Sequence, residues 1–308
     1  MDCKTPLYDL PSNVWKYAFG VLFGVISVFG TVENFLVLFT LYKFKPLHRM
    51  SNRILSSLAT SDFLASSILA PVFVAQLLKE ELSTHCRLEM LRRFLSTFFI
   101  GASVFTLGLI SYDRYLHLTK LQDYNMTIRK SNIFIFFCWF IPFLIPFLKV
   151  VGETESLYYA AVIILLVISL TVMSGCYILI IWALHKHGKL QTDKIMTKKS
   201  KGRRLRAGRT VVIILSCFML MVLPVNVHLM TSILDKNKPR SEVAVGYIIQ
   251  MALCLLNSVV NPIIYYFRTP NLKLCLKKLV GIAPRDNTWE EGSQIHYKST
   301  KIRATTEL

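Results

Sequence analysis

Long apolar segments alternate with short polar ones along the whole chain. Seven apolar segments can be counted, at about 15–42, 54–78, 91–118, 132–150, 157–184, 210–234 and 242–267. A helix that crosses a bilayer needs about 20 mostly apolar residues, and each of these segments is long enough. The pattern therefore predicts an all-α membrane protein, a seven-transmembrane helix bundle over residues 15–267.

The third segment has charged residues at both of its ends. A basic pair stands at 92–93, and the sequence Asp-Arg-Tyr follows at 113–115. Arg92, Ser103 and Arg114 are spaced eleven apart, about three helical turns each, so they fall on one stripe of the helix. Charges on such a stripe are expected to face protein rather than lipid.

Composition and charge distribution give the topology. Hydrophobic residues make up 53% of the chain, mean hydropathy is +0.47 and the formal net charge is +18, a combination that soluble domains rarely show. The bases lie between the apolar segments, so they indicate topology instead of a nucleic-acid partner. They are dense after the first, third and fifth segments, which places residues 1–14 outside a plasma membrane and the C-terminus in the cytosol.

Other membrane-protein classes fit less well. The seven cysteines are scattered without a CxxC pair, no His spacing suits a metal, and no nucleophile–base constellation is evident, so an enzyme is not expected. A transporter is the alternative from another class. It would need an internal repeat or polar residues through several spans, and neither is evident in the sequence.

Polar residues and prolines mark particular depths in several spans. Asp62 lies at mid-membrane depth in LATSD, where an acid is costly and hence a functional candidate, with Asn34 as its expected hydrogen-bond partner. The other marked positions are Asp113-Arg114-Tyr115, Trp139, Tyr177, Pro224 in FMLMVLP, and Asn257, Asn261, Pro262 and Tyr265 in NSVVNPIIYY.

Over about 15–280 these motifs resemble the class A (rhodopsin-like) G-protein-coupled receptors. The Glu-Asn pair in the first span, the very short outer loop after the fourth and the proline-free fifth span are similar to the melanocortin, cannabinoid, lysophospholipid and adenosine receptor group. The resemblance implies a receptor that passes an extracellular small-molecule, lipid or peptide signal to a heterotrimeric G protein. Peptide and nucleoside receptors, and a constitutively active receptor without a ligand, stay open as alternatives.

The resemblance also implies residue roles at the inner end of the bundle. Asp113 pairs with Arg114 at rest, and Arg114 then swings toward the G protein and meets Tyr177 and Tyr265. The implied activation residues are Asp113, Arg114, Tyr115, Tyr177, Pro224, Pro262 and Tyr265.

A sodium site is the one cofactor that the resemblance implies. Asp62, Ser103, Asn257 and Asn261 match the positions that hold this ion in the family. Oxygen ligands around one carboxylate suit a hard cation, and a water-filled polar network of the same side chains is the alternative.

Three positions depart from the family pattern. Val222 replaces the usual tryptophan before the sixth-helix proline, and Arg204 replaces the acid that restrains the inner arginine in many members, which predicts raised basal signalling. Glu89 stands at the usual cysteine position, which leaves Cys3 as the only outer partner for Cys86.

The outer end of the third span bears on the ligand. Arg92 occupies the position where lysophospholipid receptors carry a phosphate-binding arginine. Glu89 is expected to pair with Arg93 at the four-residue spacing, which leaves Arg92 available for the acidic head of a lipid. The expected ligand-binding residues are Arg92, Ser96, Ile100, Val222, Asn226 and Met251.

The chain after the seventh span divides into two parts. Residues 268–283 predict a short amphipathic eighth helix on the inner leaflet, in contact with membrane lipids, with Cys275 as a palmitoylation candidate or else a buried unmodified thiol. Residues 284–308 predict a disordered cytoplasmic tail whose hydroxyls are candidates for phosphorylation and arrestin recruitment. The terminal Thr306 and Leu308 suit a PDZ domain.

Overall fold

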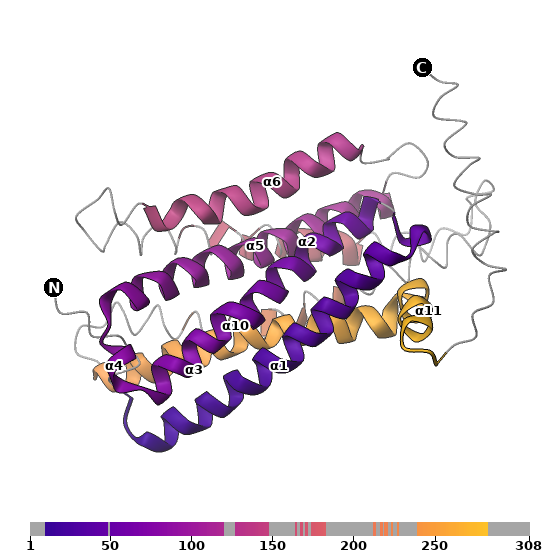
Figure 1. Cartoon of the computed structure of the whole chain (residues 1–308). Helices are drawn as coiled ribbons and strands as arrows, with labels where there is room; N and C mark the ends of the chain where they lie inside the picture. The colour runs from indigo at the N-terminus through magenta and orange to yellow at the C-terminus, as the bar shows by residue number, and fades with distance from the viewer. Residues whose placement is uncertain are drawn as a thin grey trace, which may run out of the picture.

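The structure is a computed structural model in which every regular element described is a helix (Figure 1). It describes residues 10–48, 50–119, 127–147, 164, 167–168, 170–171, 174–182, 212–213, 216–217, 219–220, 223, 227 and 239–282.

Five of the predicted spans lie within these ranges, and each is a helix long and apolar enough to cross a membrane. They are the first to fourth spans and the seventh. The fifth and sixth lie mostly outside the described residues, although 174–182 are helical. The spans are α1 (Asn13–Lys43), the joined α2 (Met50–Leu64), η3 (Ala65–Leu69) and α3 (Ala70–Leu78), α5 (Cys86–Thr119), α6 (Ile128–Leu144) with η4 (Ile145–Phe147), and α10 (Arg240–Arg268).

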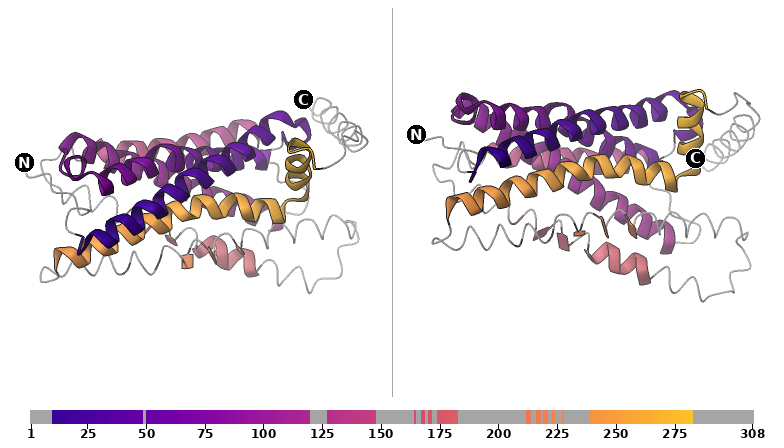
Figure 2. Two further views of the ribbon diagram at one scale, coloured as in Figure 1. Left: turned by 60° about the horizontal axis from the view of Figure 1, so that its bottom comes forward. Right: turned by 90° about the horizontal axis from the view of Figure 1, so that it is seen from below.

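Helix α5 connects the two sides of the described bundle. It packs on α2 and on α6, while α1 packs on α2, α3 and α10 (Figures 1 and 2). The end where α5 begins is called the outer end here, following the predicted topology. Many large apolar side chains of α1 and α6 are exposed, as expected of helix faces that meet lipid.

Two buried apolar clusters fill the bundle, one above the other. The outer cluster is built around Phe23, Phe73 and Ile248, and the inner cluster around Leu58 and Leu107. They hold the helices around the polar residues that lie at middle depth.

Small residues set the closest helix contacts. In α1, a Cβ atom at Gly30 would collide with the hydroxyl of Ser66, which lies in the π-helical segment η3. In α5, a Cβ atom at Gly101 would lie 2.7 Å from the Cβ of Pro142 on α6. Both contacts bring backbones close together where a side chain would keep them apart.

Short helices lie at the ends of the spans: η2 (Lys45–Leu47), α4 (Glu80–Ser83) and α11 (Pro270–Leu279). Helix α11 turns away from α10 and packs on the end of α1 (Figure 1). Leu272 and Cys275 of α11 are buried in the inner cluster, which is the environment of an unmodified thiol. Palmitoylation of Cys275 and attachment of α11 to the inner leaflet stay predictions.

Candidate functional site

Asp62 lies at the centre of the bundle, fully buried, and its carboxylate accepts hydrogen bonds from two other spans. The hydroxyls of Ser103 and Ser258 donate to Oδ1 at 2.8 and 3.0 Å, and Nδ2 of Asn261 donates to Oδ2 at 2.9 Å. The second, third and seventh spans thus meet at one carboxylate.

Ser258 is a member of this site that the sequence reasoning missed. The signal was present, because Ser258 stands three residues before Asn261 and the two therefore share a face of the helix.

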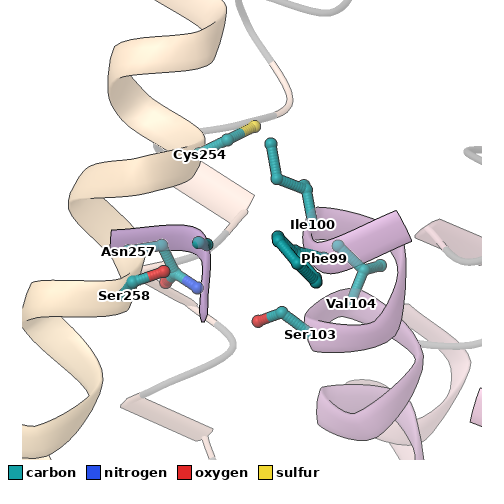
Figure 3. A pocket seen from close by; sticks show the side chains of 8 residues that line it. Phe99, Ile100, Ser103, Val104, Cys254, Asn257 and Ser258 are labelled. Atoms are coloured by element: carbon teal, nitrogen blue, oxygen red, sulfur yellow. The ribbon is translucent and has the colours of Figure 1, made fainter. Parts of the chain in front are cut away.

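Asn257 belongs to the same region without contacting Asp62 through any hydrogen bond in the described chain. It lines a small pocket between α5 and α10, together with Phe99, Ile100, Ser103 and Cys254 (Figure 3). Among the described residues its buried Oδ1 has no hydrogen-bond partner. Three of the four predicted ion ligands therefore converge on each other, and the fourth lines the adjoining pocket.

The prediction that Asn34 forms a hydrogen bond with Asp62 is wrong. Nδ2 of Asn34 donates instead to the carbonyls of Gly30 and Ser258, at 2.9 Å each. The reason lies in the seventh span: the Ser258 carbonyl would normally accept from the N–H four residues later, and that residue is Pro262, which has none. Asn34 supplies the missing donor from α1.

The predicted signalling residues lie at the inner end of the bundle. Arg114 Nε is 3.9 Å from Asp113 Oδ2, with Asp113 buried and Arg114 partly exposed. The Tyr265 hydroxyl is buried without a hydrogen-bond partner in the described part of the chain. Tyr177 accepts a bond from the Ser216 hydroxyl at 3.3 Å. Tyr265 belongs to the inner cluster, and Tyr115 and Tyr177 pack against it.

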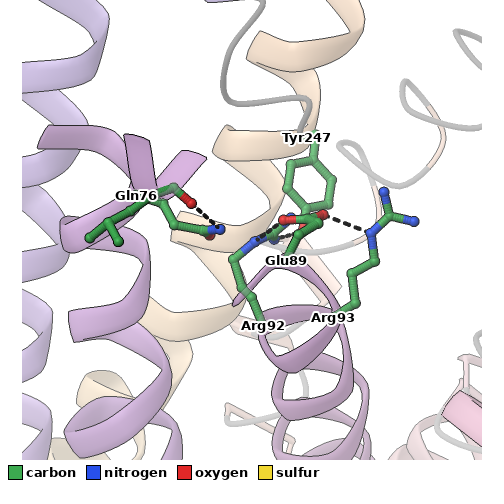
Figure 4. A network of polar contacts seen from close by, with 6 residues as sticks. Gln76, Glu89, Arg92, Arg93 and Tyr247 are labelled. Carbon is green, nitrogen blue, oxygen red and sulfur yellow. Dashed lines mark hydrogen bonds and ion pairs between the residues drawn. The ribbon is translucent and has the colours of Figure 1, made fainter. Parts of the chain in front are cut away.

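Arg92 is enclosed at the outer end of α5 (Figure 4). Only 1% of the residue is exposed, and its guanidinium carbon lies 4.9 Å from the ring centre of Phe73 and 5.2 Å from that of Tyr247. Nη1 donates to the Tyr247 hydroxyl. The arginine therefore joins the third span to the second and the seventh.

Glu89 supplies the counter-ion to this arginine. Its carboxylate accepts from Arg92 Nε at 3.0 Å and from Nη2 at 2.6 and 2.7 Å. Arg93 Nε also donates to Oε1, at 2.7 Å. The expected pair between Glu89 and Arg93 is present, but the expectation that it leaves Arg92 available is wrong, because one carboxylate reaches the residues three and four positions later at once.

Tyr247 is a second residue that the sequence reasoning missed. Its signal was weak, since a tyrosine near the outer end of a span is also an ordinary interfacial anchor.

The other predicted ligand residues lie below Arg92. Ser96 is buried one turn further along α5, and its Oγ has no hydrogen-bond partner among the described residues. Ile100 lines the pocket beside Asn257, and both Ile100 and Met251 pack on the outer cluster. Val222, Pro224 and Asn226 lie outside the described residues.

Cys86, at the start of α5, is in a disulfide. Cys138, Cys176, Cys217, Cys254 and Cys275 are in no disulfide in the described part of the chain. The expected partner, Cys3, lies outside the described residues, as do Arg204, Thr306 and Leu308.

Comparison with known proteins gives the family. Residues 33–265 match the 7 transmembrane receptor (rhodopsin family). The mouse (Mus musculus) cannabinoid receptor 2 is 25% identical, over 97% of this chain and 93% of the receptor. Sphingosine 1-phosphate receptor 1 of Danio rerio is also 25% identical, over 84% of this chain and 77% of that receptor.

A solved structure gives the fold. Squid rhodopsin superposes with a TM-score of 0.72 at 17% identity, and the match covers 92% of both chains. This likeness confirms the predicted seven-helix bundle, and the sequence relatives confirm the cannabinoid and lysophospholipid resemblance. The chain belongs to the rhodopsin family of seven-transmembrane receptors, and it is accordingly a multi-pass membrane protein that signals as a G-protein-coupled receptor rather than an enzyme.

Proposed function

We propose that this receptor responds to an acidic lipid that binds from the outer side of a plasma membrane. One observation carries the proposal: a buried arginine, Arg92, stands at the outer end of the third span and is held between aromatic rings. The names of the relatives support a lipid, because sphingosine 1-phosphate is a lipid with a phosphate head and an apolar chain.

The chemistry around Arg92 suits an anionic head group. A guanidinium presents a planar fork of donors that fits a carboxylate or phosphate, and a buried site strengthens such a bond. The Ser96 hydroxyl, buried one turn below without a described partner, supplies a further donor to the same head group. Phe99 and Ile100 lie further along α5 in the outer apolar cluster, and apolar side chains of this kind suit a hydrocarbon chain.

The test is a second-messenger assay in cells that express the receptor. Acidic lipids, neutral lipids with the same chains, peptides and nucleosides are compared, and the acidic lipids are expected to activate. Arg92→Ala should lower their potency by about tenfold or more, which corresponds to about 1.4 kcal/mol. A full response of Arg92→Ala, or activation by neutral lipids, peptides or nucleosides alone, would reject this ligand class.

A sodium ion is proposed as an allosteric ligand at Asp62. The residues present fit such an ion, since they offer one carboxylate, the two hydroxyls that contact it, and the amide oxygens of Asn257 and Asn261, which lack hydrogen-bond partners in the described chain. These are all hard oxygen ligands. The ion would hold the third and seventh spans on Asp62 and so favour the inactive arrangement.

The topology is proposed with the N-terminus outside. The charge distribution predicts that an epitope before Met1 is labelled on intact cells and an epitope after Leu308 only after permeabilisation. Labelling of the C-terminal epitope on intact cells would overturn the orientation.

Two cytoplasmic partners are proposed for the tail besides the G protein. Phosphorylated hydroxyls would recruit arrestin, and the terminal Thr306 and Leu308 would add a strand to a PDZ domain. Removing the tail hydroxyls should abolish arrestin recruitment, and one alanine added after Leu308 should abolish PDZ capture. Recruitment or capture equal to that of the native chain would reject the respective partner.

A further inference from the structure

The bond between Glu89 and Arg92 lies within one helix. The two residues stand three positions apart on α5, and the bidentate contact therefore ties no helix to another. The contacts of Arg92 with other spans go to Phe73 and Tyr247 instead. A buried ion pair is weak evidence for stability because removing both charges from water opposes the attraction between them. Stabilisation of the fold is therefore a poor explanation for the pair between Glu89 and Arg92.

The pair does keep Arg92 from standing unpaired inside the bundle. Glu89 is 4% exposed and Arg92 1% exposed, so an uncompensated charge on either would be strongly unfavourable. An acidic head group that enters the bundle presents the same chemistry as Glu89, a planar or tetrahedral set of anionic oxygens. Head group and Glu89 therefore compete for one fork of donors.

Arg93 offers the Glu89 carboxylate a second charged partner. Its Nε already lies 2.7 Å from Glu89 Oε1, and its side chain is 20% exposed, nearer to solvent than Arg92. A small rotation of the Glu89 side chain outward would keep one charged partner while it releases the other. Neither carboxylate nor guanidinium is then left without a counter-ion.

We propose that Glu89 is an internal counter-ion that moves from Arg92 to Arg93 when the acidic head of an agonist binds Arg92. Glu89 is in this way a specificity-determining residue. A neutral ligand does not compete with Glu89 for Arg92, whereas an acid does, so Glu89 sets how strongly an acid must bind in order to displace it. This inference rests on the proposed function, since it concerns the same arginine and the same ligand class.

The test uses Glu89→Gln, which keeps the shape of the side chain and removes the competing charge. Two pairs of agonist probes share their acyl chains and differ in charge: oleoyl lysophosphatidate with monooleoylglycerol, and N-oleoylglycine with N-oleoylethanolamide. At equal surface expression, Glu89→Gln should raise the potency of the acidic member of each pair by about tenfold, since the head group no longer competes with a charged carboxylate for Arg92. The potency of the neutral member should not change.

Arg93→Gln supplies the matched control, because it removes the second partner and leaves the first. It should lower the potency of the acidic probes in the native receptor, and the loss should be smaller in the Glu89→Gln background. Such a double-mutant cycle separates an effect through Glu89 from a direct contact between Arg93 and the ligand. Glu89→Asp, which keeps the charge, should stay close to the native response.

Each outcome decides the matter. Acidic potency that is unchanged or lowered in Glu89→Gln rejects the exchange while the acidic-lipid function stands. Equal losses from Arg93→Gln in both backgrounds reject the movement to Arg93. If Glu89→Gln fails to reach the surface, an unchanged acidic potency in Arg93→Gln alone rejects the exchange. No response to any acidic probe, in the native receptor or in Glu89→Gln, rejects the proposed ligand class and the exchange with it.

Discussion

Asn34 on α1 donates its side-chain N–H to the main-chain carbonyl of Ser258 on α10, at 2.9 Å. Pro262 makes this bond necessary, because it removes the N–H that would serve that carbonyl within the helix. One side chain thus satisfies the carbonyl that the proline leaves without a donor and fixes the first span to the seventh, at the residue whose hydroxyl bonds Asp62.

Replacing Asn34 by alanine should therefore destabilise the receptor. The Ser258 carbonyl would be left buried without a donor, which costs about 1–3 kcal/mol. Thermal unfolding of the purified receptor in detergent measures this as a lower melting temperature. Ser56→Ala, which removes a hydroxyl bonded to the Arg53 carbonyl of its own helix, is the control and should shift melting far less. Equal shifts for the two variants would contradict this role of Asn34.

Gly101 and Gly108 on α5 make a matched pair for a packing test. A methyl group at Gly101 would press on Pro142 of α6, whereas at Gly108 no atom of the described residues lies within 4 Å of the added carbon. We expect Gly101→Ala to destabilise by about 1–3 kcal/mol through overpacking. Gly108→Ala should be neutral or stabilise by about 0.5–1 kcal/mol, since alanine favours the helix. The same melting assay ranks them, and the reverse order would show that α5 and α6 are not held together at Gly101.

Sodium should stabilise the receptor through Asp62. The native receptor is expected to melt at a higher temperature in sodium chloride than in choline chloride of the same concentration, because the ion joins Asp62 to the seventh span. Asp62→Asn removes the charge and should abolish the difference. A sodium effect that persists in Asp62→Asn would place the ion elsewhere, and no effect in the native receptor would favour a water-filled network.

Arg204 should raise the basal signalling of the receptor. The family resemblance assigns Arg204 to the position where many members carry an acid, and from there its charge would repel Arg114 instead of restraining it. Arg204→Glu should lower ligand-free second-messenger output at equal surface expression, with Arg204→Gln falling between the two. Unchanged or higher output from Arg204→Glu would contradict a role of Arg204 in raising basal signalling.

The sequence predicted the central site well because motif order fixes depth in a membrane. Asp62 and Ser103 stand near the middle of their spans and Asn261 further along the seventh, and helices packed in one bundle bring these three residues together at one depth. Asn34 was assigned to the wrong partner because its true acceptor, the Ser258 carbonyl, is a main-chain group exposed only by the later proline.

The outer site was harder to predict, for a physical reason. Helical spacing places Glu89 within reach of both Arg92 and Arg93 and does not rank the two. The ranking comes from contacts of Arg92 with other helices, through Phe73 and Tyr247, which no local pattern contains.

Tyr247→Phe tests this last contact. The variant keeps the aromatic ring beside the guanidinium and removes only the hydroxyl that accepts from Arg92. Since the hydroxyl bridges α5 and α10, its loss should cost about 1.5–3 kcal/mol, as for other hydrogen bonds to charged groups, and should lower the melting temperature. Tyr17→Phe, at an exposed position on α1, is the control and should melt like the native receptor. The bond to Glu89 lies within α5 and survives in Tyr247→Phe, so Arg92 stays paired and the receptor should still reach the surface. Melting as stable as that of Tyr17→Phe would show that the arginine is held by Glu89 and the two rings alone, and that the third and seventh spans are not joined through the hydroxyl.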